Sequence, residues 1–200
     1  MKQIFIFFLA VLVTSNKTVQ AQEHTLKDEA GIESSEHSNA KAHRLTLSMG
    51  HTHIRKGLEH HESFKGIYEP SWLLDYDYWL SNRIAIGLHS DVVIDNFEVE
   101  AHLNDKEEVV LKRSNPVAIV PVASFKAWKN AVLQTGMGGE FAPEGNFWLL
   151  RAGIEYGFHM PKNWELSLST TYDLKLKNYD SWTFGVGVSK WFKKHHAHHG

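Results

Sequence analysis

Apolar and polar side chains alternate residue by residue through a series of short segments along this chain. Successive side chains of a β-strand point to opposite faces, so this period of two predicts strands with one apolar and one polar face. The alternation is most regular towards the C-terminus. In the segment 164–176 it places on one face Trp164, Leu166, Leu168, Thr170, Tyr172, Leu174 and Leu176.

Eight segments show this alternation, and their connections alternate in length. Short turns are expected at 80–82, 128–130 and 160–163, and longer or more polar links at 55–70, 95–115, 142–146 and 177–180. This arrangement is typical of an antiparallel up-and-down β-barrel whose termini lie at one end. Pro116 and Pro121 weaken the fourth strand, because proline cannot donate a ladder hydrogen bond. The expected strands are approximately 43–54, 71–79, 83–94, 116–127, 131–141, 147–159, 164–176 and 181–192.

All seven tryptophans lie at the ends of these segments. Indole is amphipathic and prefers the boundary between hydrocarbon and water. The nine residues from Trp182 to Trp191 span roughly 30 Å of strand, or roughly 23 Å of height at a tilt of about 40°. This height is close to the apolar band of roughly 25 Å on an outer-membrane barrel. Two belts of tryptophan therefore predict a barrel that spans a bilayer, although strict alternation places Trp79 and Trp191 on the inner face.

The alternation alone leaves open which face of the barrel is outside. A soluble, lipocalin-like binding barrel has the same period with its apolar residues inside. We favour the transmembrane orientation, because the polar face mixes glycine with both signs of charge while the apolar face is bulky and has aromatic ends. In this orientation Leu166 and Phe184 face lipid, and Glu155 and Asp173 face the barrel axis.

The ends of the chain differ from the barrel in composition. Residues 1–21 have the features of a secretory signal peptide, with Lys2, an apolar run over 4–13 and a small-residue cleavage site at 19–21. Residues 22–42 are polar and acidic, and we expect a flexible periplasmic segment. We therefore divide the chain into signal peptide 1–21, flexible segment 22–42, barrel 43–192 and a His-rich periplasmic tail 193–200.

Composition excludes several classes of protein. The chain has no cysteine, so disulfides, thiolate chemistry and lipid attachment through cysteine are excluded. No stretch after the signal reaches the roughly 20 apolar residues of a transmembrane helix, so membrane entry would require a closed sheet. Removal of the signal peptide takes away Lys2 and Lys17 and leaves 19 basic and 23 acidic residues, and this net charge of −4 argues against nucleic acid as a partner.

The signal, the meander 71–192 and the last strand resemble the small eight-stranded outer-membrane barrels, of which the transmembrane part of outer-membrane protein A is typical. The final strand, 184–192, ends on the aromatic Phe192 and is similar to the signal by which the barrel-assembly machinery recognises such proteins. The resemblance implies an outer-membrane location in a Gram-negative cell envelope, contact with outer-membrane lipid and periplasmic termini. It concerns architecture and implies no activity.

The interior of an eight-stranded barrel is only wide enough for side chains to fill it. We expect opposite charges to pair there, because an unpaired buried charge is costly. A filled polar lumen is our prediction, a proton- or ion-conducting chain is the alternative, and a general diffusion porin is disfavoured. The charged residues and histidine assigned to the inner face are Asp75, Asp77, His89, Asp91, Arg151, Glu155, Glu165, Asp173 and Lys175.

Histidine is unusually frequent, with 14 in 200 residues, and it occurs in groups. His51 and His53 share the outward face of the first strand, near its outer rim. Clustered imidazoles suit Zn²⁺, Cu²⁺ or Ni²⁺, so metal binding is the leading specific hypothesis for these groups, beside the alternative of ordinary polar loop residues. The candidate metal ligands are His51, His53, His60, His61, His195, His196, His198 and His199.

A lipid-modifying enzyme is a further alternative. His159 could approach Ser167 or Ser169 across the sixth and seventh strands, but these residues are assigned to the lumen face, away from lipid, and no G-x-S-x-G serine elbow is present. We therefore expect no enzymatic activity and no catalytic residues. The predicted role is structural or interaction-based, with loops 55–70 and 95–115 displayed to a possible extracellular partner, and envelope metal-ion homeostasis is the alternative.

Overall fold

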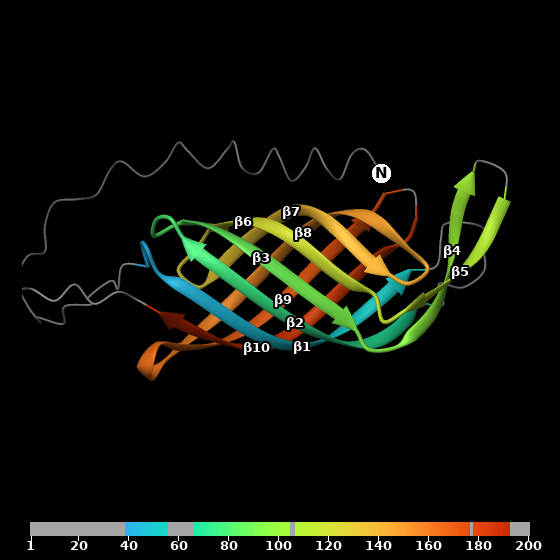
Figure 1. The fold of residues 1–200 in the computed structure, drawn as a ribbon. Coiled ribbons are helices and arrows are strands. Elements are labelled where there is room, and N and C mark those ends of the chain that lie inside the picture. The colour runs from blue at the N-terminus through green and yellow to red at the C-terminus, as the bar shows by residue number, and fades with distance from the viewer. Residues whose placement is uncertain (1–38, 56–65, 105–106, 177, 193–200) are drawn as a thin grey trace, which may run out of the picture. The chain divides into compact units, whose positions relative to one another are not determined.

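Eight strands of the computed structural model form a closed antiparallel barrel (Figure 1). The structure describes residues 39–55, 66–104, 107–176 and 178–192. Around the barrel the strand order is β1-β10-β9-β8-β7-β6-β3-β2, and β1 closes the barrel on β10. The predicted fold class, an eight-stranded up-and-down barrel, is confirmed. The barrel strands are β1 (His43–Arg55), β2 (Ile67–Trp79), β3 (Ile84–Val93), β6 (Val117–Lys126), β7 (Ala131–Ala142), β8 (Gly145–Met160), β9 (Trp164–Lys175) and β10 (Asp180–Phe192).

We call the two ends of the barrel the turn end and the loop end. The turn end holds the start of β1, the end of β10 and three short connections, at 80–83, at 127–130 and at the 3-10 turn η2 (Pro161–Asn163). The loop end holds the remaining described connections, between β3 and β6, β7 and β8, and β9 and β10. The three predicted short turns are thus confirmed, and they lie together at one end. No helix in the described part of the chain is long and apolar enough to cross a membrane.

Some sequence predictions fall outside the described residues. These are the signal peptide 1–21, most of the flexible segment 22–42 and the tail 193–200.

The connection 95–115 is largely a hairpin, which the sequence analysis assigned to a loop. β4 (Asn96–Asn104) and β5 (Glu107–Ser114) form a separate two-stranded sheet that projects from the loop end (Figure 1). The base of the hairpin packs on the barrel, because Phe97 and Val99 are buried in a cluster with Ile54 and Tyr179. The prediction of a loop was wrong because the short apolar alternation of this hairpin lies among many charged residues.

β6 continues through Pro121, although the ladder between β6 and β7 is interrupted there. Residues 117–119 pair with 141–139 and residues 122, 123, 124, 125 and 126 pair with 136–132, with no paired residues between these stretches. The backbones come close at the interruption, since a Cβ atom on Gly138 would lie 2.2 Å from the carbonyl oxygen of Ile119. Glycine therefore allows β7 to pass the proline-containing strand.

The wall of the barrel is apolar outside and polar inside. Leu166 and Phe184 are 38% and 59% exposed, whereas Glu155 and Asp173 are each 3% exposed. The predicted orientation of the strand faces is confirmed, and the arrangement is the opposite of a lipocalin-like barrel, whose apolar residues would fill the centre.

The tryptophan belts are confirmed only in part. Trp79 and Trp191 are buried inside the barrel at the turn end, with exposures of 1% and 5%, so these two residues belong to no outer belt. Strict alternation places them on the inner face, and the structure has them there. The outward, exposed tryptophans are Trp72, Trp128, Trp148, Trp164 and Trp182.

Candidate functional site

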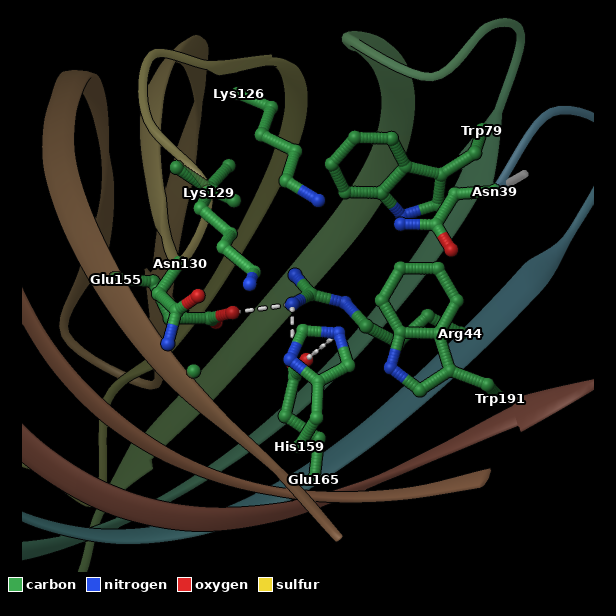
Figure 2. A pocket seen from close by; sticks show the side chains of 12 residues that line it. Asn39, Arg44, Trp79, Lys126, Lys129, Asn130, Glu155, His159, Glu165 and Trp191 are labelled. Atoms are coloured by element: carbon green, nitrogen blue, oxygen red, sulfur yellow. Dashed lines mark hydrogen bonds and ion pairs between the residues drawn. The ribbon is translucent and has the colours of Figure 1, made fainter. Parts of the chain in front are cut away.

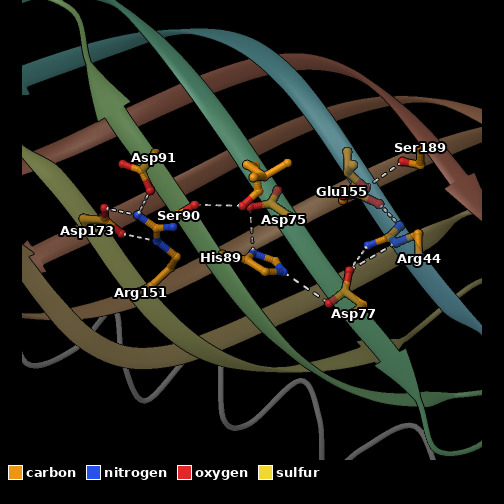
Figure 3. A network of polar contacts seen from close by, with 12 residues as sticks. Arg44, Asp75, Asp77, His89, Ser90, Asp91, Arg151, Glu155, Asp173 and Ser189 are labelled. Carbon is orange, nitrogen blue, oxygen red and sulfur yellow. Dashed lines mark hydrogen bonds and ion pairs between the residues drawn. The ribbon is translucent and has the colours of Figure 1, made fainter.

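The charged lumen is the first candidate site, and its turn-end half is organised around Arg44. The Arg44 side chain points inward from β1 and is 1% exposed. Its Nη2 lies 2.7 Å and its Nε 3.2 Å from Oδ2 of Asp77 on β2 (Figure 3). Its Nη1 also pairs with Glu155 on β8 and lies 3.3 Å from Glu165 on β9 (Figure 2). One guanidinium thus connects four strands across the lumen, which suits its five fixed N–H donors.

His89 extends this network along β3. Its Nε2 lies 3.2 Å from Oδ1 of Asp77, and its Nδ1 lies 3.6 Å from Oδ1 of Asp75 (Figure 3). The first distance is that of a hydrogen bond, and the second is that of an ion pair without a hydrogen bond. An imidazolium suits this position, because both of its ring nitrogens donate.

A second cluster lies around Arg151 of β8. Its Nε and Nη2 donate to the two carboxylate oxygens of Asp173 at 2.7 and 2.6 Å, and Nη2 also donates to Asp91 at 2.6 Å (Figure 3). The two-point contact with Asp173 is the geometry in which arginine binds a carboxylate most strongly. Asp91 on β3 and Asp173 on β9 are therefore tied together through the lumen.

A third cluster closes the loop end. Glu140 of β7 accepts from Arg113 of the hairpin at 2.5 Å and from the hydroxyl of Tyr179, and it lies 3.3 Å from Nζ of Lys175. The Arg113 guanidinium also lies 4.4 Å from the ring centre of Phe147. Burial, together with the Glu140 carboxylate, raises the pKa of the Tyr179 hydroxyl well above its ordinary value, so this group remains a hydrogen-bond donor.

The indoles of Trp79 and Trp191 cover the turn end of the lumen. Their ring centres are 5.5 Å apart, and the Arg44 guanidinium lies 6.0 and 5.6 Å from them (Figure 2). The hollow beside them has a volume of about 10 Å³, and Glu155 and Glu165 are among its lining residues. A single water needs about that much space, so side chains fill this end of the lumen.

Every buried arginine, lysine and carboxylate in the described lumen lies within ion-pair distance of an acidic or basic side chain, as the sequence analysis predicted, and the partner of Asp75 is His89, which is charged only when protonated. All nine groups assigned inward are buried. The analysis missed Arg44 and Glu140, which the same alternation could have placed inside, and Arg113, which comes from the unexpected hairpin. The full set is Arg44, Asp75, Asp77, His89, Asp91, Arg113, Glu140, Arg151, Glu155, Glu165, Asp173 and Lys175.

The second candidate site is the pair of histidines on β1. His51 is exposed on the outer face and His53 is half-exposed on the same face, where its ring stacks on Tyr68 at 4.5 Å between ring centres. In the described part of the chain, no group of three or more His, Cys, Asp or Glu residues is placed to hold a metal ion. The remaining predicted ligands lie outside the described residues, namely His60, His61, His195, His196, His198 and His199.

The structure does not pair His159 with a serine. The cross-strand partner of His159 is Glu165, and Nε2 of the half-exposed imidazole lies 3.1 Å from the Glu165 carboxylate. Ser167 lies opposite Gly157 and Ser169 opposite Glu155. The side chain that orients His159 is thus an acid rather than a hydroxyl nucleophile.

Comparisons with known proteins show the fold. No family model matches the sequence, and no curated protein matches it. Among solved structures, Ail, the attachment invasion locus protein of Yersinia pestis, in complex with the heparin analogue sucrose octasulfate, matches with a TM-score of 0.52 and 12% identity, over 76% of this chain and 99% of Ail. OprG of Pseudomonas aeruginosa matches with a TM-score of 0.45 and 11% identity over 78% and 98% of the two chains. The likeness to Ail shows that this chain has the fold of a small eight-stranded outer-membrane barrel.

Proposed function

We propose that this protein spans the outer membrane of a Gram-negative cell as a barrel with a filled polar lumen and no enzymatic activity. Its role is structural or interaction-based and is exerted through its loop end. The observation that carries the proposal is the distribution of side chains, because an apolar outer wall surrounds an interior of buried polar and charged side chains. Water solvates such a wall poorly, whereas hydrocarbon solvates it well.

The outer wall supports a membrane location because its exposed apolar residues continue around the barrel. On β1, Leu47 and Met49 are 54% and 61% exposed, and on β10 Phe184 and Val186 are 59% and 55% exposed. Soluble monomers rarely display a continuous apolar surface of this kind. All barrel strands are paired with two neighbours, so lipid meets no free sheet edge.

A depth-dependent substitution tests this location. Val186 lies near the middle of β10, opposite Met49 and Leu168, whereas Leu80 lies at the turn end beyond β2. Both side chains are exposed. Arginine at the bilayer midplane costs about 2–4 kcal/mol, and near the interface about 0–1 kcal/mol. We expect Val186→Arg to lower the unfolding free energy in liposomes by the larger amount and Leu80→Arg by the smaller amount. Equal losses of unfolding free energy in the two variants would exclude the location of Val186 near the bilayer midplane.

The interaction role assigns the hairpin β4–β5 to the extracellular side. Arg113 anchors its base, since Nη1 donates to the carbonyl of Gly145 at 2.7 Å and Nη2 donates to Glu140. Exposed Glu98 and Lys112 face solvent beside this anchor. An epitope inserted at 105–106 should be detected on intact cells, whereas one inserted in the turn 80–83 should require permeabilised cells. Detection of only the second epitope on intact cells would reverse the orientation.

This orientation agrees with a periplasmic location of both ends of the barrel segment and with recognition of β10 by the barrel-assembly machinery. We expect Phe192→Ala to reduce the amount of folded barrel in outer membranes, while Phe141→Ala, an exposed aromatic at the loop end, should not. Equal yields of the two variants would remove recognition through the end of β10.

Envelope metal-ion binding remains a second candidate function, because His51 and His53 share one face at the loop end. Zn²⁺, Cu²⁺ and Ni²⁺ accept imidazole ligands. In equilibrium dialysis of the full chain, the double variant His51→Ala/His53→Ala should take up less metal than the unmodified protein, whereas His43→Ala, at the turn end, should leave the uptake unchanged. Absence of uptake by the unmodified protein, or unchanged uptake by the double variant, would remove this candidate for the pair.

A further inference from the structure

The turn end of the barrel carries a ring of basic side chains. Three lie in or beside the short turns and are exposed, namely Arg83, Lys129 and Lys162. The others are Lys41, before β1, and Lys126 and Lys190, at the ends of β6 and β10. We call these six residues the basic ring: Lys41, Arg83, Lys126, Lys129, Lys162 and Lys190.

Acidic side chains at this end point into the lumen. Glu155 and Glu165 are 3% exposed and pair with Arg44, and Asp77 is fully buried beside the same guanidinium. Among the described residues, none of the exposed side chains at the turn end is acidic. The described surface of this end is therefore strongly cationic, although the chain as a whole has a formal net charge of −2.

The loop end has the opposite balance. Its described surface has two basic side chains, Arg55 and Lys112. Its exposed or half-exposed acidic side chains are Glu69, Asp95, Glu98, Glu144 and Asp180. The described part of the barrel is thus electrically asymmetric along its axis, and its exposed cations are concentrated where the short turns lie.

The basic ring lies at the height of aromatic side chains that mark a membrane interface. Nζ of Lys190 is 4.6 Å from the ring centre of Trp164 and donates to the carbonyl of Lys162 at 2.8 Å. Trp128, next to Lys129, is 66% exposed. Indole prefers the headgroup region, and lysine places its ammonium in the same region while its stem contacts apolar surface. Lys162 and Lys190 are therefore positioned beside lipid headgroups, whereas Lys126 and Lys129 also line the hollow at the mouth of the lumen (Figure 2).

We propose that the basic ring binds anionic phospholipid headgroups of the leaflet that surrounds the turn end. The ligand is the phosphate-bearing, net negative headgroup of a phospholipid such as phosphatidylglycerol, held by several ammonium and guanidinium groups at once. This inference rests on the proposed membrane location. Each basic residue close to an anionic lipid surface contributes roughly a fivefold gain in association. The acidic loop end repels the same headgroups, so selectivity is confined to one leaflet.

Quenching by brominated lipids tests this proposal. The full chain is folded into phosphatidylcholine liposomes that contain either brominated phosphatidylcholine or brominated phosphatidylglycerol at equal mole fraction. Gel mobility and tryptophan emission first establish that the barrel is folded and inserted. In a background in which the outward loop-end tryptophans are replaced (Trp72→Phe/Trp148→Phe/Trp182→Phe), outward Trp128 and Trp164 then report the lipids next to the turn end. We expect stronger quenching by brominated phosphatidylglycerol, with an apparent preference of at least about fivefold at low salt.

Charge reversal at the exposed turn residues is the decisive comparison. The triple variant Arg83→Glu/Lys129→Glu/Lys162→Glu should lose the preference. Lys112→Glu, which reverses an exposed cation at the loop end, is the matched control and should retain it. Salt at 1 M should also weaken the preference of the unmodified protein, because the Debye length falls to about 3 Å.

The possible outcomes are distinguishable. Failure of the unmodified protein to insert into either liposome would overturn the proposed membrane location. Insertion with equal quenching by the two lipids would overturn only the headgroup site, as would a preference that survives in the triple variant. Binding of soluble polyglutamate by the detergent-solubilised barrel, without any lipid preference, would also overturn the proposal and assign the ring to an acidic protein.

Discussion

Removal of Arg44 should destabilise the barrel more than removal of any surface cation. The guanidinium pairs with Asp77, Glu155 and Glu165, and all four side chains are almost completely buried. Arg44→Met retains much of the side-chain volume but removes the charge and every N–H donor. Three carboxylates would then remain inside a lumen that side chains fill.

The magnitude follows from the partners that would remain. Asp77 would still contact His89, and Glu165 would still contact His159. Among the described residues, Arg44 is the one cation that pairs with Glu155, so this carboxylate would lose its partner entirely. Removal of one partner of a buried ion pair lowers the unfolding free energy by about 3–5 kcal/mol. We expect Arg44→Met to lower the unfolding free energy by about that amount.

The matched control is a surface pair that also joins two neighbouring strands. Arg55 of β1 lies 3.4 Å from Asp180 of β10, and its side chain is 42% exposed. Exposed pairs of this kind contribute about 0–1 kcal/mol. Arg55→Met should therefore cost less than Arg44→Met by a factor of three or more.

Urea unfolding of the barrel in liposomes measures both variants. Tryptophan emission and gel mobility follow the transition, and the slope of free energy against urea should be similar in all three proteins. Arg44→Lys should fall between Arg44→Met and the unmodified protein, because it keeps the charge but loses the planar fork. A cost below 1 kcal/mol for Arg44→Met would refute the view that this ion-pair network stabilises the lumen.

Two further predictions concern the backbone and the loop end. Gly138→Ala should lower the unfolding free energy by about 1–3 kcal/mol in the same urea titration, because its Cβ would clash with the backbone oxygen of Ile119. The control Gly185→Ala should cost less, because its Cβ would meet a serine hydroxyl that can rotate away. Hydrogen bonds from Ser114 hold the pKa of exposed Glu144 below its usual value. These bonds therefore stabilise the loop end at a pH above the usual pKa of glutamate, and this stabilisation is lost as the pH falls through the lowered pKa of the folded protein. Ser114→Ala should raise the pKa of Glu144 towards its usual value in an NMR titration, and an unchanged titration would contradict this.

Alternation predicted the barrel and divided its residues between two faces, and the composition of those faces indicated which one is outside. Side chains of a strand alternate strictly, so one correctly placed residue fixes the face of its neighbours. Asp75 and Asp173 are inside for this reason. Trp79 and Trp191 follow the same rule, and the apparent tryptophan belt failed at these positions because their indoles pack on each other and over Arg44.

The identity of the partners inside the lumen could not be predicted. Arg44 and Glu155 are 111 residues apart and lie on strands that are not neighbours in the barrel. Their contact depends on the stagger and tilt of all eight strands, which alternation does not encode. The hairpin β4–β5 was missed for a different reason. Its buried Phe97 and Val99 occupy a short stretch of charged sequence, and they pack on the loop end instead of continuing the barrel wall.

The orientation of the wall in a bilayer is the central claim, and the absence of cysteine from the chain makes it directly measurable. Single spin labels at Leu166→Cys and Val186→Cys, and at Ser167→Cys and Ser189→Cys, sample outward and inward positions of β9 and β10. In liposomes, the outward labels should collide readily with oxygen and rarely with a water-soluble nickel chelate. The inward labels should be immobile and shielded from both. Outward labels that are accessible to the nickel chelate would show that water, and not lipid, surrounds this barrel.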